Sequence, residues 1–315
     1  FIAEPHRDKM NNSSYFIKGK AMFGSYPSQE AVQELEKEGV RFFVDLTFPD
    51  ERKILPYTTK YNYLRFPITD CKAPRDWRSF AQLVVHLANV ITGLGNEERV
   101  YIHCKGGHGR SGVVVACLLC YIFKIDPSTA LQRTSASHSK RSVMRDKWRK
   151  LGSPQTYHQK NFVHKFFSPL KFHRPFRHGH TAGFSTLTAH PVTIPGLGTF
   201  PTAEAAIQAH KAAGDVEYIK KLKTVKSPSV AIAAGNAVDC PEWSEIEQNV
   251  TYLVLRAKFD QYPELKSALL DTGLRQIVQC YSSEEHGPSE NSSVGKALME
   301  LRSHYYLSEG FGGLD

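Results

Sequence analysis

Residues 103–112, with the sequence HCKGGHGRSG, decide how the first half of this 315-residue chain is interpreted. They follow ERVYIHC (98–104), a β-branched and aromatic stretch that predicts a strand, and they precede VVVACLLCYIF (113–123), which predicts an apolar helix. The glycines allow the loop to curl so that successive backbone N–H groups point inward and form an anion-binding nest. The dipole at the start of the following helix adds to this positive field. The stretch therefore predicts a phosphate-binding loop between a strand and a helix.

Two side chains of this loop carry the chemistry. An arginine at position 110 can form a bidentate fork on two phosphate oxygens. A thiol beside an arginine and a helix start ionises more readily than a free thiol. Cys104 is therefore expected to be an anionic nucleophile beneath a bound phosphate.

The loop resembles the HCxxGxxR[ST]G signature of the cysteine-dependent protein tyrosine phosphatase superfamily, and every fixed position is matched. The resemblance to the dual-specificity branch covers roughly residues 14 to 165 and implies an α/β domain with a central mixed or parallel sheet flanked by helices. It implies a phosphocysteine intermediate on Cys104, a phosphoryl clamp by Arg110, and no metal or cofactor. The further residues that the resemblance assigns to the site are Ser111 for departure of the thiolate, His103 for support of the thiolate, and Lys105, Gly106, Gly107, His108 and Gly109 with Arg110 for phosphate binding.

The order of elements expected from the residues leads to the same fold class. QEAVQELEKE (29–38) predicts a helix, and RFFVDLT (41–47) and YNYLRFPI (61–68) predict strands. Apolar residues spaced by 4, 3 and 4 positions predict a helix over 77–91, ahead of the strand and the apolar helix that flank the loop. Strands that alternate with helices indicate a parallel or mixed sheet covered by helices.

A leaving alkoxide or phenoxide needs a proton, so a general acid is expected. In the family it is an Asp about thirty residues before the Cys, on a loop after a strand. Asp70, in FPITDCKAP (66–74), lies 34 residues before Cys104 and fits this position. The alternative is Asp76, which could instead cap the helix that begins near residue 77. Cys71 beside Asp70 is either a partner for a regulatory disulfide with Cys104 or a plain loop thiol.

The substrate of this half stays open at this point. The loop residues Lys105 and His108 add positive charge around the phosphate, as similar insertions do in the phosphoinositide 3-phosphatase branch. RNA 5′-triphosphatase relatives usually carry Asn before the Arg, where this chain has Gly109. We therefore expect hydrolysis of phosphotyrosine, phosphoserine or phosphothreonine in a phosphorylated protein, or of another phosphorylated substrate, with a phosphoinositide or RNA 5′-phosphate as the alternative.

The second half resembles the NADAR family of N-glycosidases over about residues 183 to 305, which implies a mainly helical α+β domain. Glu204 matches the Glu of the family's P-T-x-E helix, and Trp243 matches its D-W or E-W position. A carboxylate opposite an anomeric carbon suits hydrolysis through an oxocarbenium-like state, and Trp stacks on a base or a sugar. The alternative places Glu204 on a solvated helix face and Trp243 in the core. The stretches that carry the resemblance are GFSTL (183–187), FPTAEAAIQAHKA (200–212), the stretch from PEWSE to LLDTG (241–273) and VGKALMELR (294–302).

One stretch of this half departs from the family. Where the family has an acid followed by W-G-x-G, the chain reads SSEEHGPSE (282–290), with His286 in place of the aromatic residue and Glu284 or Glu285 as the acid. Two interpretations stay open: an N-glycosidase for ADP-ribosyl or nucleotide substrates with an altered ribosyl pocket, or a module that only binds ADP-ribose or a nucleotide. Helices are expected over 201–214, 245–257, 264–271 and 293–303.

These patterns divide the chain into a phosphatase domain over 1–167, a basic linker over 168–180 and a NADAR-like domain over 181–315. The net charge of +9 divides in the same way. Up to residue 180, 29 basic and 15 acidic residues give +14, whereas 11 basic and 16 acidic residues give −5 for the remainder. Any anionic partner is therefore expected on the first half.

The basic charge is concentrated over 133–180, where 12 Lys and Arg residues accompany the single acid Asp146. This stretch predicts either binding to nucleic acid or anionic lipid, or a solvated basic surface. The aromatic residues within it could stack on bases or pack in the core. These residues are Trp148, Tyr157, Phe162, Phe166 and Phe167.

The overall composition, with 41% hydrophobic and 23% charged residues, is that of a globular protein rather than a disordered, collagenous or membrane chain. The apolar run over 113–123 has 11 residues, fewer than the roughly 20 that a membrane span needs, so no span is expected. The six cysteines form no paired CxxC motifs, which favours a reducing compartment. We therefore expect a cytoplasmic bifunctional protein, with the nucleus as the alternative location.

Overall fold

The computed structural model describes residues 12–174, 181–281 and 292–310. These residues form two compact units, one comprising residues 12–167 with 309–310, and the other comprising residues 168–174, 181–281 and 292–308. Each unit has its own apolar core, so each is described separately.

The first unit is built on a five-stranded mixed sheet with the order β1-β2-β5-β3-β4. Only the β1–β2 pair is antiparallel, and the other neighbours run parallel. In this register Gly24, Asp45 and His103 lie opposite one another, so the carboxyl ends of β2, β3 and β5 meet at one edge. Loops that follow parallel strands gather at that edge, which positions the site. The strands are β1 (Ser13–Ile17), β2 (Ala21–Gly24), β3 (Val40–Asp45), β4 (Asn62–Arg65) and β5 (Arg99–His103).

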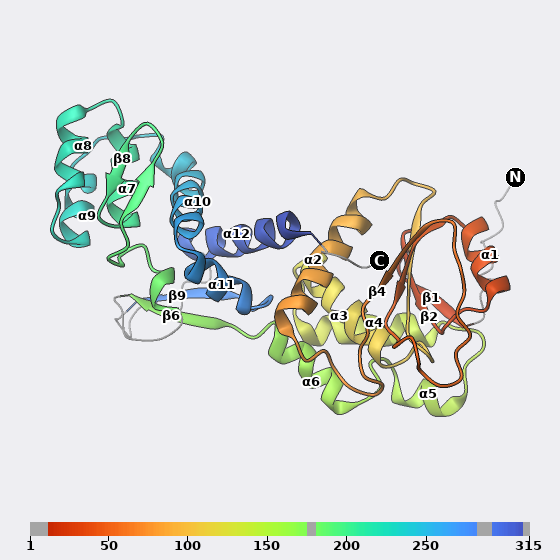
Figure 1. Ribbon diagram of the computed structural model, residues 1–315. Helices are drawn as coiled ribbons and strands as arrows, with labels where there is room; N and C mark the ends of the chain where they lie inside the picture. Colours follow the sequence, from red (N-terminus) through yellow and green to blue (C-terminus); the bar gives the residue numbers. More distant parts are fainter. Residues whose placement is uncertain (1–11, 175–180, 282–291, 311–315) are drawn as a thin grey trace, which may run out of the picture. The chain divides into compact units, whose positions relative to one another are not determined.

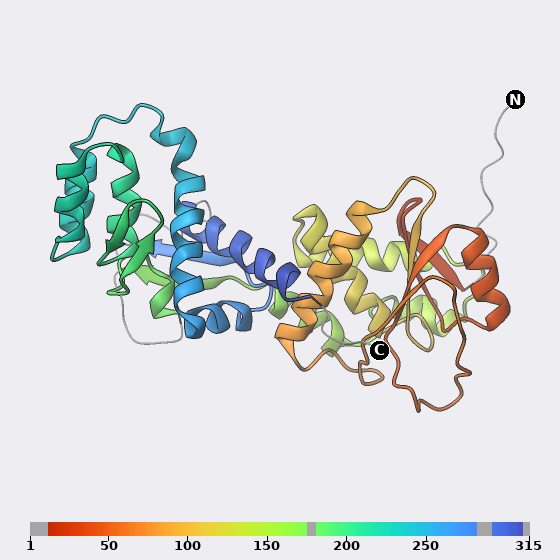
Figure 2. The same ribbon diagram turned by 45° about the horizontal axis from the view of Figure 1, so that its top comes forward.

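Helices cover both faces of this sheet, as Figure 1 and Figure 2 show: α1 lies on one side, and α2, α3, α4 and α6 gather on the other. Helix α3 is central to the second layer because its residues from Arg110 to Cys120 are all buried. The helices are α1 (Gln29–Lys37), α2 (Trp77–Gly93), α3 (Arg110–Phe123), α4 (Pro127–Ser139), α5 (Asp146–Leu151) and α6 (Tyr157–Phe166). The expected α/β class is confirmed.

Two parts of this unit differ from the sequence expectation. Strands β1 and β2 were not predicted, and β2, with the sequence AMFG, contains no β-branched residue. Of the aromatic residues in the basic stretch, Phe162 and Phe166 are buried and pack on Phe80. Core packing, rather than stacking on bases, is therefore the role of these two rings.

The second unit is mainly helical, as expected, with two small two-stranded sheets. Strand β6 pairs in parallel with β9, and β7 pairs with β8 in antiparallel fashion. Its strands are β6 (Leu170–Arg174), β7 (Val192–Ile194), β8 (Gly198–Phe200) and β9 (Ile277–Tyr281). Its helices are α7 (Ala203–Ala209), α8 (Val216–Lys223), α9 (Pro228–Asn236), α10 (Trp243–Gln261), α11 (Pro263–Asp271) and α12 (Ser293–Glu309), with short 3-10 turns at Ala182–Phe184 and His210–Ala212.

The segment expected to be a linker, 168–180, differs from that expectation over part of its length. Residues 170–174 form β6, and their backbone pairs with β9, more than one hundred residues further along the chain. Pro169 lies just before this strand, where its missing N–H group costs no ladder hydrogen bond, and Pro175 lies outside the described residues. The signal at Pro169 therefore marked the start of a strand rather than a break in structure.

Two further observations concern the whole described chain. All six cysteines are free thiols, and Cys117 and Cys120 are buried within α3. Within residues 12–174, 181–281 and 292–310, no helix is long and apolar enough to cross a bilayer.

Candidate active site

The loop between β5 and α3 curls around the sulfur of Cys104. The Gly107 N–H donates a hydrogen bond to Cys104 Sγ at 3.3 Å, and Cys104 is only 3% exposed. Gly107 has a φ of +73°, and a Cβ at this position would lie 2.3 Å from the carbonyl carbon of Gly24. Only glycine fits this conformation and this close approach to β2. The hydroxyl oxygen of Ser111, in the first turn of α3, lies 3.6 Å from the sulfur.

Arg110 lies at the start of α3 with its guanidinium almost fully buried, at 1% exposure. Its two terminal nitrogens donate to the two carboxylate oxygens of Glu51 at 2.8 and 2.7 Å, and one also donates to the carbonyl oxygen of Ile68 at 3.1 Å. Its Nε is buried and hydrogen-bonds none of the described residues. The fork is therefore fixed on its outer side, while one donor is left for a ligand oxygen.

Glu51 was not identified from the sequence. It lies in the loop after β3, 59 residues before Arg110, and no motif connects the two positions. The hydrogen bonds from Arg110 hold the pKa of Glu51 below its ordinary value, so the carboxylate is ionised near neutral pH. The only feature of the sequence that could have indicated Glu51 is its position in the loop after a predicted strand, because β3 and β5 lie in the same sheet.

The structure separates the two candidates for the general acid. An oxygen of the Asp70 carboxylate lies 3.1 Å from a terminal nitrogen of Arg110, and its side chain is 61% exposed. Asp76 instead accepts hydrogen bonds from the backbone N–H groups of Arg78 and Ser79. Asp76 therefore caps α2, and only Asp70 is shown beside the loop arginine.

The loop that carries Asp70 is connected to α6. The Gln159 side chain is fully buried and donates to the carbonyl oxygen of Lys72 at 3.0 Å. The Gln155 amide lies 3.2 Å from the sulfur of Cys71, which is exposed. These two glutamines, which the sequence did not single out, hold the Asp70 loop next to the phosphate loop.

His103 is fully buried at the end of β5 and is held by two neighbours. Its Nε2 lies 2.7 Å from the Tyr57 hydroxyl, and its Nδ1 lies 3.9 Å from a carboxylate oxygen of Asp45. Burial lowers the pKa of His103 to about 4, so the ring is neutral near pH 7. His103 can therefore fix the start of the loop, but it brings no positive charge to the sulfur.

The expected charge at His108 is wrong. Burial lowers the pKa of His108 to about 4, and nearby Arg141 contributes to the shift. The ring turns away to pair with His138, whose Nε2 lies 2.8 Å from its Nδ1, and it stacks on Trp148 with a centroid distance of 4.7 Å. Lys105 is half-buried, and its charge helps to lower the pKa of Glu51.

In the second unit, Glu204 lies in the first turn of α7 and is 8% exposed, so the expectation of a solvated helix face is wrong. Its carboxylate accepts hydrogen bonds from the Thr186 hydroxyl at 2.6 Å and from the Gln208 amide at 2.8 Å. Its backbone N–H also donates to the carbonyl oxygen of Thr186. Thr186 belongs to GFSTL, so the structure brings two of the stretches that carry the NADAR resemblance into contact.

Trp243 begins α10 and is partly buried against the apolar cluster that α7, α9 and α10 share. The Lys211 ammonium lies 4.9 Å from the centroid of its ring. No hydrogen bond or ion pair within the described part of the chain joins Trp243 to Glu204. The residues proposed as the altered ribosyl pocket, Glu284, Glu285 and His286, lie outside the described residues.

Comparisons with known proteins place both units. A family model described as Swiss Army Knife protein, DSP-PTPase phosphatase domain, matches residues 10–163, and a NADAR domain model matches residues 165–305. Protein 197R of Invertebrate iridescent virus 6, which carries the name tyrosine phosphatase, is 33% identical over 294 residues, covering 91% of this chain and 89% of its own. The chain belongs to the tyrosine and dual-specificity phosphatase family. It combines a phosphatase domain of this family with a NADAR domain.

Each half also has relatives of its own. The N-glycosidase YbiA of Escherichia coli (strain K12) is 34% identical over 135 residues, which cover 40% of this chain and 82% of YbiA. Among solved structures, Tk-PTP in the active form shares 23% identity, covers 50% of this chain and 95% of its own, and has a TM-score of 0.39.

Proposed function

We propose that the phosphatase domain hydrolyses phosphate monoesters through a phosphocysteine intermediate on Cys104. The observation that carries this proposal is the loop itself: one turn brings together the Cys104 sulfur, the Gly107 N–H and the Ser111 hydroxyl. Arg110, the first residue of α3, adds a buried Nε that hydrogen-bonds none of the described residues. A positive, largely water-free nest of this kind stabilises the charge that develops on a transferring phosphoryl group.

The chemistry proceeds in two steps. The Cys104 thiolate attacks phosphorus, the bond between phosphorus and the ester oxygen breaks, and Asp70 donates a proton to the leaving oxygen. A water molecule then attacks the phosphocysteine and transfers a proton to Asp70. The P–S bond breaks, inorganic phosphate leaves, and the Ser111 hydroxyl donates a hydrogen bond to the departing thiolate.

The substrate we favour is a phosphorylated protein, with phosphotyrosine, phosphoserine or phosphothreonine as the scissile group. The support is the name tyrosine phosphatase that the viral relative 197R carries. The alternative is a phosphoinositide or an RNA 5′-phosphate, and it is supported by the basic residues that surround the loop. The experiment on a further pocket, described below, separates peptide from nucleotide substrates.

The reaction is tested by hydrolysis of p-nitrophenyl phosphate by the full chain. Turnover is expected for the wild type and is expected to be lost in Cys104→Ser, because an alcohol is a poor nucleophile at neutral pH. The matched control is Cys71→Ser, which removes an exposed thiol of the Asp70 loop and should keep the wild-type rate. Turnover by Cys104→Ser, or an inactive wild type, contradicts the mechanism.

For the NADAR domain we propose hydrolysis of an N-glycosidic bond in an ADP-ribosyl or nucleotide substrate, with Glu204 as the carboxylate that faces the anomeric carbon. The support is the buried position of Glu204 and the similarity to YbiA, a relative named as an N-glycosidase. The hydrogen bonds from Thr186 and Gln208 fix the orientation of this carboxyl group, which a role opposite an oxocarbenium-like state requires. The alternative is a module that binds such a ligand without cleaving it.

This proposal is tested by incubating the full chain with ADP-ribosylated nucleic acid and measuring released ADP-ribose by chromatography. Release by the wild type is expected, and Glu204→Gln is expected to abolish it. Glu217→Gln, which removes a carboxylate from the exposed face of α8, is the matched control. Binding of the substrate without any release by the wild type supports the binding module, and equal release by Glu204→Gln contradicts the role of Glu204.

A further inference from the structure

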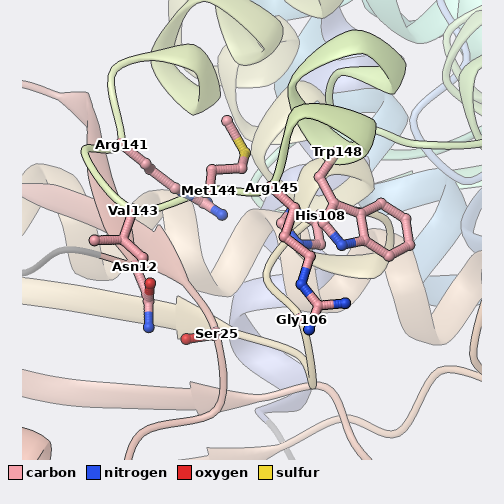
Figure 3. Close-up of a pocket in the computed structure, with 9 residues that line it drawn as sticks. All are labelled: Asn12, Ser25, Gly106, His108, Arg141, Val143, Met144, Arg145 and Trp148. Carbon is pink, nitrogen blue, oxygen red and sulfur yellow. The ribbon is translucent and has the colours of Figure 1, made fainter.

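A pocket of about 260 Å³ lies beside the phosphate loop and contains residues that the proposed reaction does not use (Figure 3). Gly106 and His108 of the loop form part of its wall, and the remaining wall comes from three other segments. Its lining includes Asn12, Ser25, Gly106, His108, Arg145 and Trp148. The pocket is therefore built on the loop that would hold the scissile phosphate, but it does not include Cys104.

The charge of the pocket is positive. None of its nine lining residues is acidic, and two are arginines. The Arg145 side chain is exposed, makes no hydrogen bond or ion pair with any described residue, and extends toward Gly106 in Figure 3. Arg141 is 3% exposed and donates to the carbonyl oxygen of Gly107 at 2.8 Å, so its charge is fixed behind the loop. An unpaired guanidinium beside a fixed one is a binding site for an anion rather than for a cation.

The remaining walls are neutral and rigid. His108 is held between His138 and the ring of Trp148, and both histidines have pKa values lowered by burial, so neither titrates near pH 7. Asn12 and Ser25 add neutral polar side chains to the pocket. A ligand therefore meets one free positive charge among neutral polar groups, a donor set that fits phosphate oxygens.

The distance to the reaction centre limits what this anion can be. Gly106 lies two residues after Cys104, and two residues of chain span at most about 7 Å. A group in the pocket is therefore close enough to belong to the molecule whose phosphate lies over Cys104. Beyond the pocket, exposed cations continue over the adjoining residues Lys140, Lys147 and Lys150, with Asp146 as the only acid. A row of cations of this kind suits a strand with a repeating negative charge better than an isolated anion.

Resting on the proposed phosphatase chemistry, and taking the nucleic-acid alternative in place of the phosphorylated protein, we propose that this pocket binds the second phosphate of a nucleotide strand whose terminal 5′-phosphate is the scissile group, with Arg145 as the residue that recognises its charge. The second phosphate is a phosphodiester, so it is bound and not cleaved. Binding of this second phosphate would lower the KM for oligonucleotides relative to mononucleotides.

The test compares two dinucleotides that differ only in the charge of their linkage. The first is 5′-phosphorylated thymidine dinucleotide, and the second has the same terminal phosphate but a neutral methylphosphonate linkage. Release of inorganic phosphate is measured with the full chain. For the wild type, we expect kcat/KM to be about tenfold higher for the charged linkage, the effect of one charge-assisted hydrogen bond.

Variants of the chain test whether Arg145 causes the preference for the charged linkage. Arg145→Ala is expected to reduce the ratio of the two kcat/KM values to about one, and Arg145→Lys should restore part of it because it keeps the charge. Arg133→Ala removes an exposed cation of α4 that neither lines the pocket nor belongs to these adjoining cations, and it should keep the wild-type ratio. A wild-type ratio near one, or an unchanged ratio in Arg145→Ala, overturns the proposal.

A binding measurement separates this pocket from the phosphatase mechanism. Titration calorimetry of the Cys104→Ser chain with the two dinucleotides should show the same tenfold preference, whether or not the wild type turns over p-nitrophenyl phosphate. Loss of turnover with a retained preference thus contradicts the mechanism but supports the pocket. If a doubly phosphorylated peptide, rather than the dinucleotide, shows the dependence on Arg145, the pocket belongs to a peptide substrate and the nucleotide assignment is overturned.

Discussion

The two units differ in the partners of their buried charges. At its active-site edge the phosphatase domain pairs them with opposite charges, whereas its buried Arg141, behind the loop, donates to the carbonyl oxygens of Gly107 and Phe23. The Arg110 guanidinium faces the carboxylates of Glu51 and Asp70 at the edge of the sheet. Nearby, the buried carboxylate of Asp45 pairs with Arg65 at 3.2 Å. In such pairs the removal of one partner leaves an uncompensated buried charge, so the geometry of each pair is critical.

The NADAR domain holds its buried charges with neutral groups. Lys258 is fully buried, and its ammonium donates to the carbonyl oxygens of Gly183 and Ser185 and to the hydroxyl of Thr188. Glu204, in contact with the same stretch of chain, has only the hydroxyl and amide partners already described. No ion pair involving either residue occurs within the described part of the chain.

This difference has a chemical consequence. A charged side chain that faces an opposite charge keeps its ionisation state over a wide pH range. The function of such a site is sensitive to changes in the geometry of the pair. A charge held by neutral dipoles has its ionisation set by burial, which lowers the pKa of Lys258 to about 7. We therefore expect the activity of the phosphatase domain to depend mainly on the geometry of its charged side chains. We expect the stability of the NADAR domain to depend on pH.

The largest effect is expected for Arg110→Lys, which keeps the charge but removes the planar fork. We expect kcat/KM for p-nitrophenyl phosphate to fall about a thousandfold, because an ammonium cannot contact both carboxylate oxygens of Glu51 and a phosphate oxygen together. The matched control is Arg52→Lys, an exposed position next to Glu51, which should keep the wild-type value. A loss of less than tenfold for Arg110→Lys would show that charge alone, without geometry, is sufficient in this domain.

The contrast between the units also explains what the sequence could predict. Cys104, Arg110 and Ser111 lie within eight consecutive residues, so their contacts follow from local geometry around Gly107. Glu51 could not be predicted in the same way, because its contact with Arg110 depends on how β3 and β5 align in the sheet. Local patterns therefore identify the reacting groups, whereas the residues that hold them depend on the tertiary fold.

Other differences have the same origin. The pKa of His108 is lowered by burial and by Arg141, which is 33 residues away, and the ring stacks on Trp148, which is 40 residues away. The burial of Glu204 depends on Thr186, which precedes it by 18 residues. The expected helices at 29–38 and 77–91 are confirmed, because their periodicity and caps are encoded locally.

A second prediction tests the neutral partners of Lys258. Between pH 7 and about 10.4 the unfolded chain binds the Lys258 proton and the folded chain does not, so stability should rise with pH over this window and be flat below it. From pH 7 to 9 we expect the unfolding free energy to rise by about 1.4 kcal/mol per pH unit. Lys258→Met should lack this slope.

The measurement is urea denaturation followed by the fluorescence of Trp243. The chain has three tryptophans, and replacing Trp77 and Trp148 by Phe leaves a signal from the second unit alone. Lys221→Met, at an exposed position of α8, is the matched control and should keep the slope of its parent. The same slope in Lys258→Met and its parent would contradict a proton-binding site at Lys258.

The smallest of the three effects is expected for Glu51→Gln, which tests Glu51 as a positioning residue for Arg110. Gln has the size of Glu but offers an NH2 group to one of the two guanidinium nitrogens, so the bidentate contact is lost. We expect kcat/KM for p-nitrophenyl phosphate to fall about thirtyfold, which corresponds to about 2 kcal/mol. Most of the loss should appear as a higher KM, because an unfixed fork binds the phosphate less well.

A purely structural role for Glu51 gives a different result. It would lower the melting temperature and the amount of active enzyme, and hence kcat, while KM stayed at the wild-type value. Asp50→Asn removes the same charge from the neighbouring exposed position and should change neither constant. If Glu51→Gln and Asp50→Asn have the same KM, then Arg110 needs no carboxylate to hold it. The pairing of opposite charges would then not distinguish the phosphatase domain from the NADAR domain.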